Sequence, residues 1–221
     1  MEGIVIKSIE YKEKSKLVYL YTPFGMKGVK ALDAAKTKLG FVTTLNWVEF
    51  EATDSKLPTV IEYSLKESFY SLYSDLSKVG VLSPMLDLLL HLEDHVNHKR
   101  IFSFFQRILV ALRDTKDPYY ILSLFLVKML AVYGVRPELK GCVLCGGTRI
   151  VHFSILEGGA LCDSCASFHD KNYALYQAFR SLYFTNELEE QELPISYKEL
   201  LDAIYSYYLV HANIKLKEYH L

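Results

Sequence analysis

Cys142-Val143-Leu144-Cys145 is followed, sixteen residues later, by Cys162-Asp163-Ser164-Cys165, and these four cysteines are the only ones in the chain. Two Cys-x-x-Cys pairs at this separation are typical of a site in which four thiolates bind one zinc ion tetrahedrally. Four protein ligands complete the coordination shell and leave no position for water or substrate. The motif therefore predicts one structural zinc ion per chain and places any other chemistry elsewhere.

The segment between the two pairs has the composition of a β-hairpin. Residues 149–156 alternate and are rich in β-branched side chains, and Glu157-Gly158-Gly159 is a turn sequence. We therefore expect a zinc module over residues 140–167. A disulfide pairing of the same cysteines would need an oxidising compartment. The N-terminal residues lack the basic and apolar regions of a signal peptide, so we expect a reducing, cytoplasmic location.

The composition indicates a globular protein with an uneven charge distribution. The chain has 221 residues, of which 51% are hydrophobic and 23% charged, enough for one or two cores. Its most apolar run, residues 119–135, contains Lys128, which favours a buried helix over a membrane span. Residues 1–40 hold eight lysines against four acidic residues (net +4), whereas residues 181–221 hold three lysines against seven (net −4). This split predicts a basic working face and an acidic end, or else simple solubilising charge.

The hydrophobic period divides the chain into two parts. Short alternating runs at 3–9, 17–22, 28–32, 43–52 and 59–65 predict five antiparallel strands, which fit a small oligonucleotide-binding (OB) type barrel. Helical patterns follow at about 74–94, 99–113, 119–133, 172–190 and 196–212, with Pro84 kinking or restarting the first. We therefore expect an α+β protein: an N-terminal five-stranded OB-type β-barrel over 1–78, then an α-helical bundle over 79–221 that carries the inserted four-cysteine zinc module.

Several stretches in this order resemble the RecO family of recombination mediators. The most specific stretch is Val127-Lys128-Met129-Leu130-Ala131-Val132-Tyr133-Gly134-Val135-Arg136-Pro137-Glu138-Leu139, which leads into the first cysteine pair. Gly3-Ile4-Val5-Ile6 and Tyr21-Thr22-Pro23-Phe24-Gly25 are similar to the opening strands of the family. Residues 32–38 differ, because they hold lysines and Asp33 where the family loop is usually rich in arginine.

The resemblance implies a non-enzymatic protein of DNA repair and homologous recombination, in the bacterial cytoplasm and associated with the nucleoid. It would bind single-stranded and double-stranded DNA, anneal strands and assist recombinase loading. The implied protein partners are RecR and the C-terminal tail of single-stranded DNA-binding protein, and no membrane is implied.

The sequence offers four candidate DNA-contacting lysines on the predicted barrel: Lys27, Lys30, Lys36 and Lys38. Lysine is a flexible point charge suited to sequence-independent phosphate contacts. Four aromatic residues interleave with them and could stack unpaired bases or fill the barrel core: Tyr19, Tyr21, Phe24 and Phe41.

The helical part offers candidates for capturing an acidic peptide tail with an aromatic end. Its tyrosines could line an apolar pocket or pack the bundle: Tyr119, Tyr120, Tyr205, Tyr207 and Tyr208. Its available cations are Arg107, Arg113, Lys128, Arg136 and Arg180, and the sequence does not choose among them.

Two other functions compete with the first. One is an RNA-associated or ribosome-associated barrel with a zinc module. The other is a metal-dependent hydrolase that uses His91 and His95, four residues apart as on one helix face. The spacing of Glu93 does not match that of zinc peptidases, and a solvated helix end is the alternative for this segment. No phosphate-binding loop or nucleophile motif occurs in the sequence.

Overall fold

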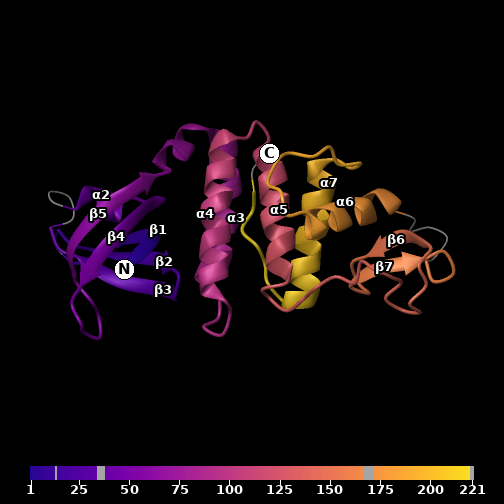
Figure 1. Cartoon of the computed structure of the whole chain (residues 1–221), viewed down its shortest axis with the longest axis horizontal. Coiled ribbons are helices and arrows are strands. Elements are labelled where there is room, and N and C mark those ends of the chain that lie inside the picture. Colours follow the sequence, from indigo (N-terminus) through magenta and orange to yellow (C-terminus); the bar gives the residue numbers. More distant parts are fainter. Residues whose placement is uncertain (13, 34–37, 167–171, 220–221) are drawn as a thin grey trace. The chain divides into compact units, whose positions relative to one another are not determined.

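The computed structural model describes residues 1–12, 14–33, 38–166 and 172–219. Backbone contacts divide the chain into two compact units. The first unit consists of Met1–Val79 and Leu86–Asp114, and the second of Gly80–Met85 and Thr115–Leu221. Figure 1 labels the elements of each unit.

The first unit is built on five antiparallel strands. They are β1 (Glu2–Glu10), β2 (Lys16–Thr22), β3 (Gly25–Ala31), β4 (Asn46–Ala52) and β5 (Val60–Ser68), in the order β3-β2-β1-β4-β5. The two end strands meet at a parallel bridge between Lys30 and Thr59, where the Lys30 N–H donates to the Pro58 carbonyl at 2.8 Å. This connection closes the sheet in the order of an OB-type barrel. The predicted fold class is confirmed.

Alternating residues of the strands fill the barrel. Val5, Val18 and Leu20 are completely buried and belong to one apolar cluster. A short helix that the sequence pattern did not predict, α2 (Leu39–Val42), adds Phe41, whose ring lies 5.5 Å from that of Phe50. The predicted strand 43–52 begins only at Asn46, because Leu45 has a left-handed backbone (φ 66°).

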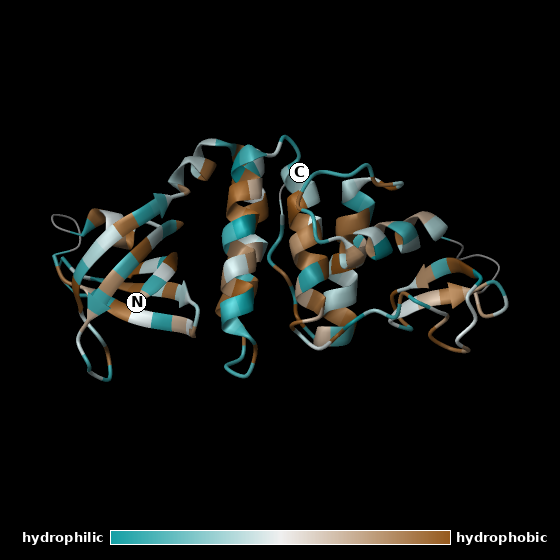
Figure 2. Ribbon diagram, viewed as in Figure 1, coloured by the Kyte–Doolittle hydropathy of each residue, from teal (hydrophilic) through white to brown (hydrophobic). Residues whose placement is uncertain are grey.

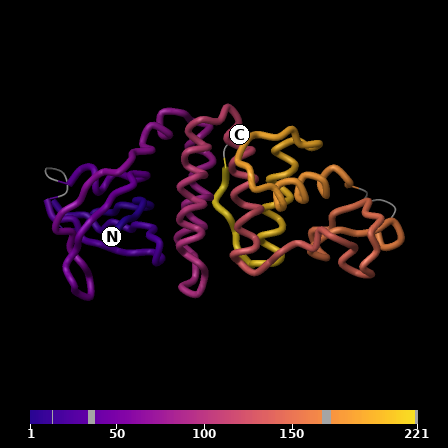
Figure 3. Tube along the Cα trace, in the orientation of Figure 1, coloured from indigo at the N-terminus to yellow at the C-terminus, as the bar shows by residue number. Residues whose placement is uncertain are grey.

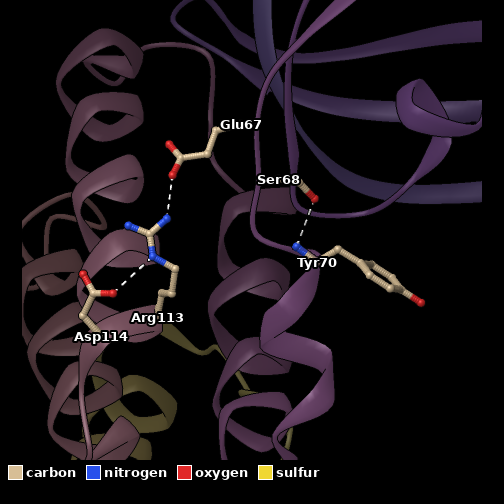
Figure 4. Close-up of polar contacts among 5 residues, drawn as sticks. All are labelled: Glu67, Ser68, Tyr70, Arg113 and Asp114. Carbon is tan, nitrogen blue, oxygen red and sulfur yellow. Dashed lines mark hydrogen bonds and ion pairs between the residues drawn. The ribbon is translucent and has the colours of Figure 1, made fainter.

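One long helix of the first unit packs on the barrel. This helix is α4 (His98–Asp114). Before it in the chain come a single 3₁₀ turn, η1 (Tyr70–Ser74), and helix α3 (Leu76–Leu90), of which Gly80–Met85 belong to the second unit. Figure 2 shows apolar and polar residues alternating along α4, as expected for a helix with one buried face. Near its C-terminus, the Arg113 guanidinium contacts Glu67 of β5 at 2.6 Å and its own neighbour Asp114 at 3.2 Å (Figure 4).

The second unit is a helical bundle with a two-stranded hairpin. Its helices are α5 (Pro118–Leu130), α6 (Tyr173–Phe184) and α7 (Tyr197–Tyr207), which continues as a π-helical turn, η2 (Tyr208–Ala212). The side chains of Asp117, Asn172 and Ser196 accept backbone N–H groups at the three helix starts. The hairpin strands are β6 (Ile150–Ser154) and β7 (Gly159–Cys162). Within the described residues, no helix combines the length and apolarity of a membrane span.

Three predicted helix ends were wrong. Helix α5 ends at Leu130, short of residue 133. Helix α3 runs through Pro84 without a restart and ends at Leu90, short of residue 94. Helix α6 ends at Phe184, short of residue 190, because the backbone of Thr185 is extended.

In Figure 3 the C-terminal segment returns along the bundle after η2. The Tyr205 hydroxyl holds it by donating to the Lys217 carbonyl at 2.8 Å.

Candidate functional site

The first cysteine pair lies in a tight turn. The Gly146 N–H donates to the Cys142 carbonyl at 2.8 Å, and the Cys142 N–H donates to the Gly147 carbonyl at 2.8 Å. Gly146 has a φ of 75°, which a residue without a Cβ adopts at little cost. In the second pair, the Cys165 N–H donates to the Cys162 carbonyl at 3.1 Å. The two turns direct all four sulfurs toward one point.

The sulfur positions fit one tetrahedral metal ion. The four Sγ atoms lie within 4.8 Å of one another, and no other group of three or more potential ligands in the described residues is as close. The Sγ of Cys145 lies 3.5 Å from that of Cys162 and 3.6 Å from that of Cys165. A tetrahedron with Zn–S bonds of 2.3 Å has edges of about 3.8 Å, whereas a disulfide requires about 2.05 Å. The cysteines are therefore placed to hold a metal ion and are not paired as disulfides.

The ionisation of these thiols also suits a cation. Burial opposes ionisation of Cys142, but the backbone amides of Cys162, Cys145 and Leu144 hydrogen-bond its sulfur and lower its pKa to about 6. The neighbouring sulfurs of Cys145, Cys162 and Cys142 raise the pKa of Cys165 to about 12. Four thiolates this close repel one another, and a divalent cation between them offsets that repulsion.

The hairpin of the cysteine module is anchored in the bundle. Phe153 of β6 stacks on Phe179 of α6 with ring centroids 4.2 Å apart. The Tyr207 hydroxyl donates to the Gly158 carbonyl at 3.2 Å, and Nε2 of His211 lies 2.5 Å from the Ile155 carbonyl oxygen. Loss of order at the cysteines would therefore reach the core of the second unit.

The candidate DNA-contacting lysines do not share one face. Lys27 pairs with Leu20, which is buried in the barrel core, whereas Lys30 pairs with Leu17 on the outer side of β2. A spacing of three residues places two side chains on opposite faces of a strand, and this signal was already present in the sequence. Lys38 donates from Nζ to the Val60 carbonyl at 2.9 Å, beside the barrel closure. Lys36 lies outside the described residues.

The four aromatic candidates have different environments. Tyr21 and Phe41 are completely buried, Tyr21 against α4 and Phe41 inside the barrel. Phe24 is 83% exposed at the turn between β2 and β3. Tyr19 is half-buried on the outer side of β2.

The histidine pair of the hydrolase hypothesis does not share a helix face. Helix α3 ends at Leu90, so His91 and His95 lie beyond it. Nδ1 of His91 lies 2.8 Å from the Asp87 carbonyl oxygen, and Nδ1 of His95 lies 3.0 Å from a Glu93 carboxylate oxygen. The four-residue spacing therefore does not create a shared metal site here.

A shallow hollow of about 560 Å³ lies beside α6 in the second unit. Tyr173, Tyr176 and Arg180 line it from the helix, and Glu192, Leu193 and Pro194 line it from the segment that follows. Among the candidate cations, Lys128 instead donates to the carbonyls of Tyr183 and Thr185.

Comparison with known proteins identifies the family. The model described as "Recombination protein O C terminal" matches residues 73–220, about two thirds of the chain. The chain belongs to the RecO family. The family match thus covers the helical unit and the four-cysteine module.

RecO proteins named as DNA repair proteins align with most of the chain. That of Halalkalibacterium halodurans is 29% identical over 231 residues, covering 98% of this chain and 91% of the relative. That of Listeria welshimeri is 30% identical over 183 residues, covering 79% of this chain and 71% of the relative. That of Alkaliphilus metalliredigens is 27% identical over 228 residues, covering 96% and 93%. The alignments with the Halalkalibacterium and Alkaliphilus proteins cover nearly the whole chain and so include the barrel as well as the helical unit.

Proposed function

We propose that this chain acts in DNA repair as a non-enzymatic mediator of homologous recombination. It binds single-stranded and double-stranded DNA, anneals complementary strands and assists the loading of recombinase, in the cytoplasm at the nucleoid. The observation that carries the proposal is the alignment of 98% of the chain with a protein named DNA repair protein RecO. An OB-type barrel, a fold that commonly binds oligonucleotides, is consistent with it.

Strand annealing tests this function directly. Two complementary labelled oligonucleotides, coated with single-stranded DNA-binding protein, should anneal faster with the full chain present and without any nucleotide cofactor. Unlabelled structured RNA competes with single-stranded DNA in a parallel binding titration. Stronger competition by RNA than by DNA, with no annealing, would favour the RNA-associated alternative.

The metal in this proposal is one structural zinc ion bound by Cys142, Cys145, Cys162 and Cys165. Support comes from the donor set, because four thiolates in two Cys-x-x-Cys pairs are typical of structural zinc sites and leave no open position. Metal analysis of the purified chain should return one zinc per chain. Two bound ions per chain would require a second site and would revive a metal-dependent activity.

DNA contact is proposed to involve Lys27, Lys30, Lys36 and Lys38 through phosphates, with little preference for sequence. Lys36→Glu with Lys38→Glu should weaken binding about equally for all sequences. Each lost phosphate contact should reduce the slope of log affinity against log salt by about 0.7 for single strands. Because Lys38 also donates to the Val60 carbonyl, a melting curve must accompany this variant.

The proposed protein partners are RecR and the acidic C-terminal tail of single-stranded DNA-binding protein. A tail with an aromatic end needs an apolar pocket and a nearby cation for its carboxylates. The hollow beside α6 presents the rings of Tyr173 and Tyr176 to an aromatic end group and the guanidinium of Arg180 to a carboxylate, with Glu192 also in its lining. A labelled tail peptide should bind the full chain saturably at low salt, and Arg180→Gln should weaken that binding. Wild-type affinity in the Arg180→Gln variant would move the peptide away from this hollow.

A further inference from the structure

The outer side of β1, β2 and β3 carries an accessible tyrosine in a row of paired residues. Lys7 of β1 pairs with Tyr19 of β2, and Tyr19 pairs with Gly28 of β3. Directly paired residues project from the same face of a sheet. The neighbours of Tyr19 along the strand, Val18 and Leu20, are completely buried in the barrel core. The row Lys7–Tyr19–Gly28 therefore faces outward.

Gly28 leaves the tyrosine ring without a side chain beside it on β3. A Cβ placed on Gly28 would lie 3.8 Å from Cε1 of Tyr19. The ring thus lies next to bare backbone and remains half-buried. The other tyrosine of β2, Tyr21, points to the same side but is completely covered, with its ring 6.2 Å from that of Phe102 in α4. Helix α4 therefore bounds this face at one end.

Two lysines flank the ring. Lys7 lies directly across from Tyr19, and Lys30 lies on the same face one diagonal step away, because it pairs with Leu17. Diagonal neighbours in a sheet are about 7–8 Å apart, within reach of a long side chain. Neither lysine forms an ion pair with any residue that the structure describes.

The opposite outer face of the barrel has the opposite charge. Glu49 and Glu51 of β4 and Glu62 of β5 are exposed there, with Glu51 directly paired with Glu62. Lys66, on this side of β5, lies 3.7 Å from Glu49 and is also bound by Glu2. A polyanion is repelled from this acidic face and attracted to the face with Lys7 and Lys30.

We propose that the outer face of β1, β2 and β3 is a platform for single-stranded DNA, on which an unpaired base stacks on Tyr19 while Lys7 and Lys30 contact the flanking phosphates. This inference rests on the proposed DNA-binding function and specifies its site. Bases of a single strand are free to stack on an aromatic ring, whereas those of a duplex are stacked on each other. Tyr19 therefore favours the binding of single strands over duplex, whereas the two lysines contact the phosphates of both.

The test measures binding of the full chain to a labelled oligo-dT of about 16 nucleotides, the upper end of the site size of one OB fold, and to a duplex of equal length. Tyr19→Ala should weaken oligo-dT binding about 5- to 150-fold, the range that one base–aromatic stack supplies. Duplex binding should not change. Tyr19→Phe keeps the ring and should bind as the wild type does.

Two further sets of variants separate the ring from the fold and from the charge. Tyr19→Leu keeps apolar volume without an aromatic face. It should lose as much oligo-dT affinity as Tyr19→Ala does, and it serves as the test if the alanine variant is unstable. Lys7→Gln and Lys30→Gln should each weaken the binding of both oligo-dT and duplex. Each should also reduce the slope of log affinity against log salt for oligo-dT by about 0.7. Lys66→Gln, on the acidic face, is the charge-matched control and should change neither the affinity for oligo-dT nor that for duplex.

The outcomes distinguish this inference from the proposed function. Wild-type oligo-dT affinity in folded Tyr19→Ala and Tyr19→Leu overturns the platform but leaves DNA binding intact. Equal losses for oligo-dT and duplex in the tyrosine variants overturn base stacking. If the wild type binds neither ligand at low salt, the proposed function fails and the platform fails with it.

Discussion

The hydroxyl oxygen of Tyr21 in β2 lies 3.2 Å from Nδ1 of His98 at the start of α4, a hydrogen bond between residues 77 positions apart in the chain. Tyr21 is completely buried and His98 is 8% exposed. The two rings also meet edge to face, with centroids 5.8 Å apart. The contact fixes α4 on the outer side of the barrel, so a helix that follows all five strands belongs to the first unit.

Tyr21→Phe should destabilise the chain, because it removes the hydroxyl and leaves Nδ1 of His98 buried without this partner. An unsatisfied buried polar group costs about 1–3 kcal/mol. Urea unfolding followed by circular dichroism measures the difference. Tyr219→Phe removes an exposed hydroxyl bound to Asp202 and serves as the control with a smaller loss. Equal midpoints for Tyr21→Phe and wild type would mean that water satisfies His98.

A fragment of residues 1–114 should fold, whereas a fragment of residues 1–78 should not. The shorter fragment lacks α4 and exposes the apolar surface around Tyr21. Exposed apolar surface costs about 25 cal/mol per Å². Amide dispersion in a heteronuclear NMR spectrum distinguishes the two states. A well-dispersed spectrum for residues 1–78 alone would support independent folding of that range.

The sequence could predict α4 but not the surface that it covers. Its apolar residues recur with a helical period, which indicates one buried face. The same pattern fits packing on the barrel or on the other helices, because periodicity carries no information about the partner. The predicted division at residue 78 followed the change of period, and whether 1–78 and 79–221 fold independently stays a prediction.

Lys128→Met should destabilise the second unit. All residues of α5 other than Tyr119 and Lys128 are buried, and Lys128 donates to the carbonyls of Tyr183 and Thr185 at the end of α6. Methionine keeps much of the volume but leaves those carbonyls without the ammonium, a loss of about 1–3 kcal/mol. Lys128→Arg keeps a donor and should lose less. Thermal melts of the two variants provide the comparison, and a methionine variant as stable as wild type would contradict this role.

The role of Lys128 shows where sequence reasoning stops. Its apolar run was correctly predicted to form a buried helix. The run gave no sign, however, that the ammonium would cap another helix 55 residues away. The end of α6 was missed for the same reason, since Thr185 leaves the helix where this tertiary contact is available. By contrast, the cysteine cluster was predictable, because two short local turns determine most of its geometry.

Cys162→Ser should release the metal and lower the melting temperature. Binding energy at a closed thiolate site is folding energy, and this site is joined to the bundle through Phe153 and Phe179. A loss of even 2 kcal/mol would lower the melting temperature of a chain this size by roughly 4–8 °C. Ser164→Ala, an exposed position between two of the ligands, is the matched control. Metal loss with an unchanged melting curve would refute the structural role.

Glu62→Lys should stabilise the barrel, because Glu51 and Glu62 are like charges paired directly across β4 and β5. Replacing such a pair by opposite charges contributes about 0.2–1 kcal/mol. Glu62→Gln removes the repulsion without adding attraction, so its unfolding midpoint should lie between those of the wild type and Glu62→Lys. Chemical denaturation at low salt, where surface charges are least screened, measures the order. The gain should shrink at high salt, and a gain that survives there would have to come from packing or strand propensity and not from charge.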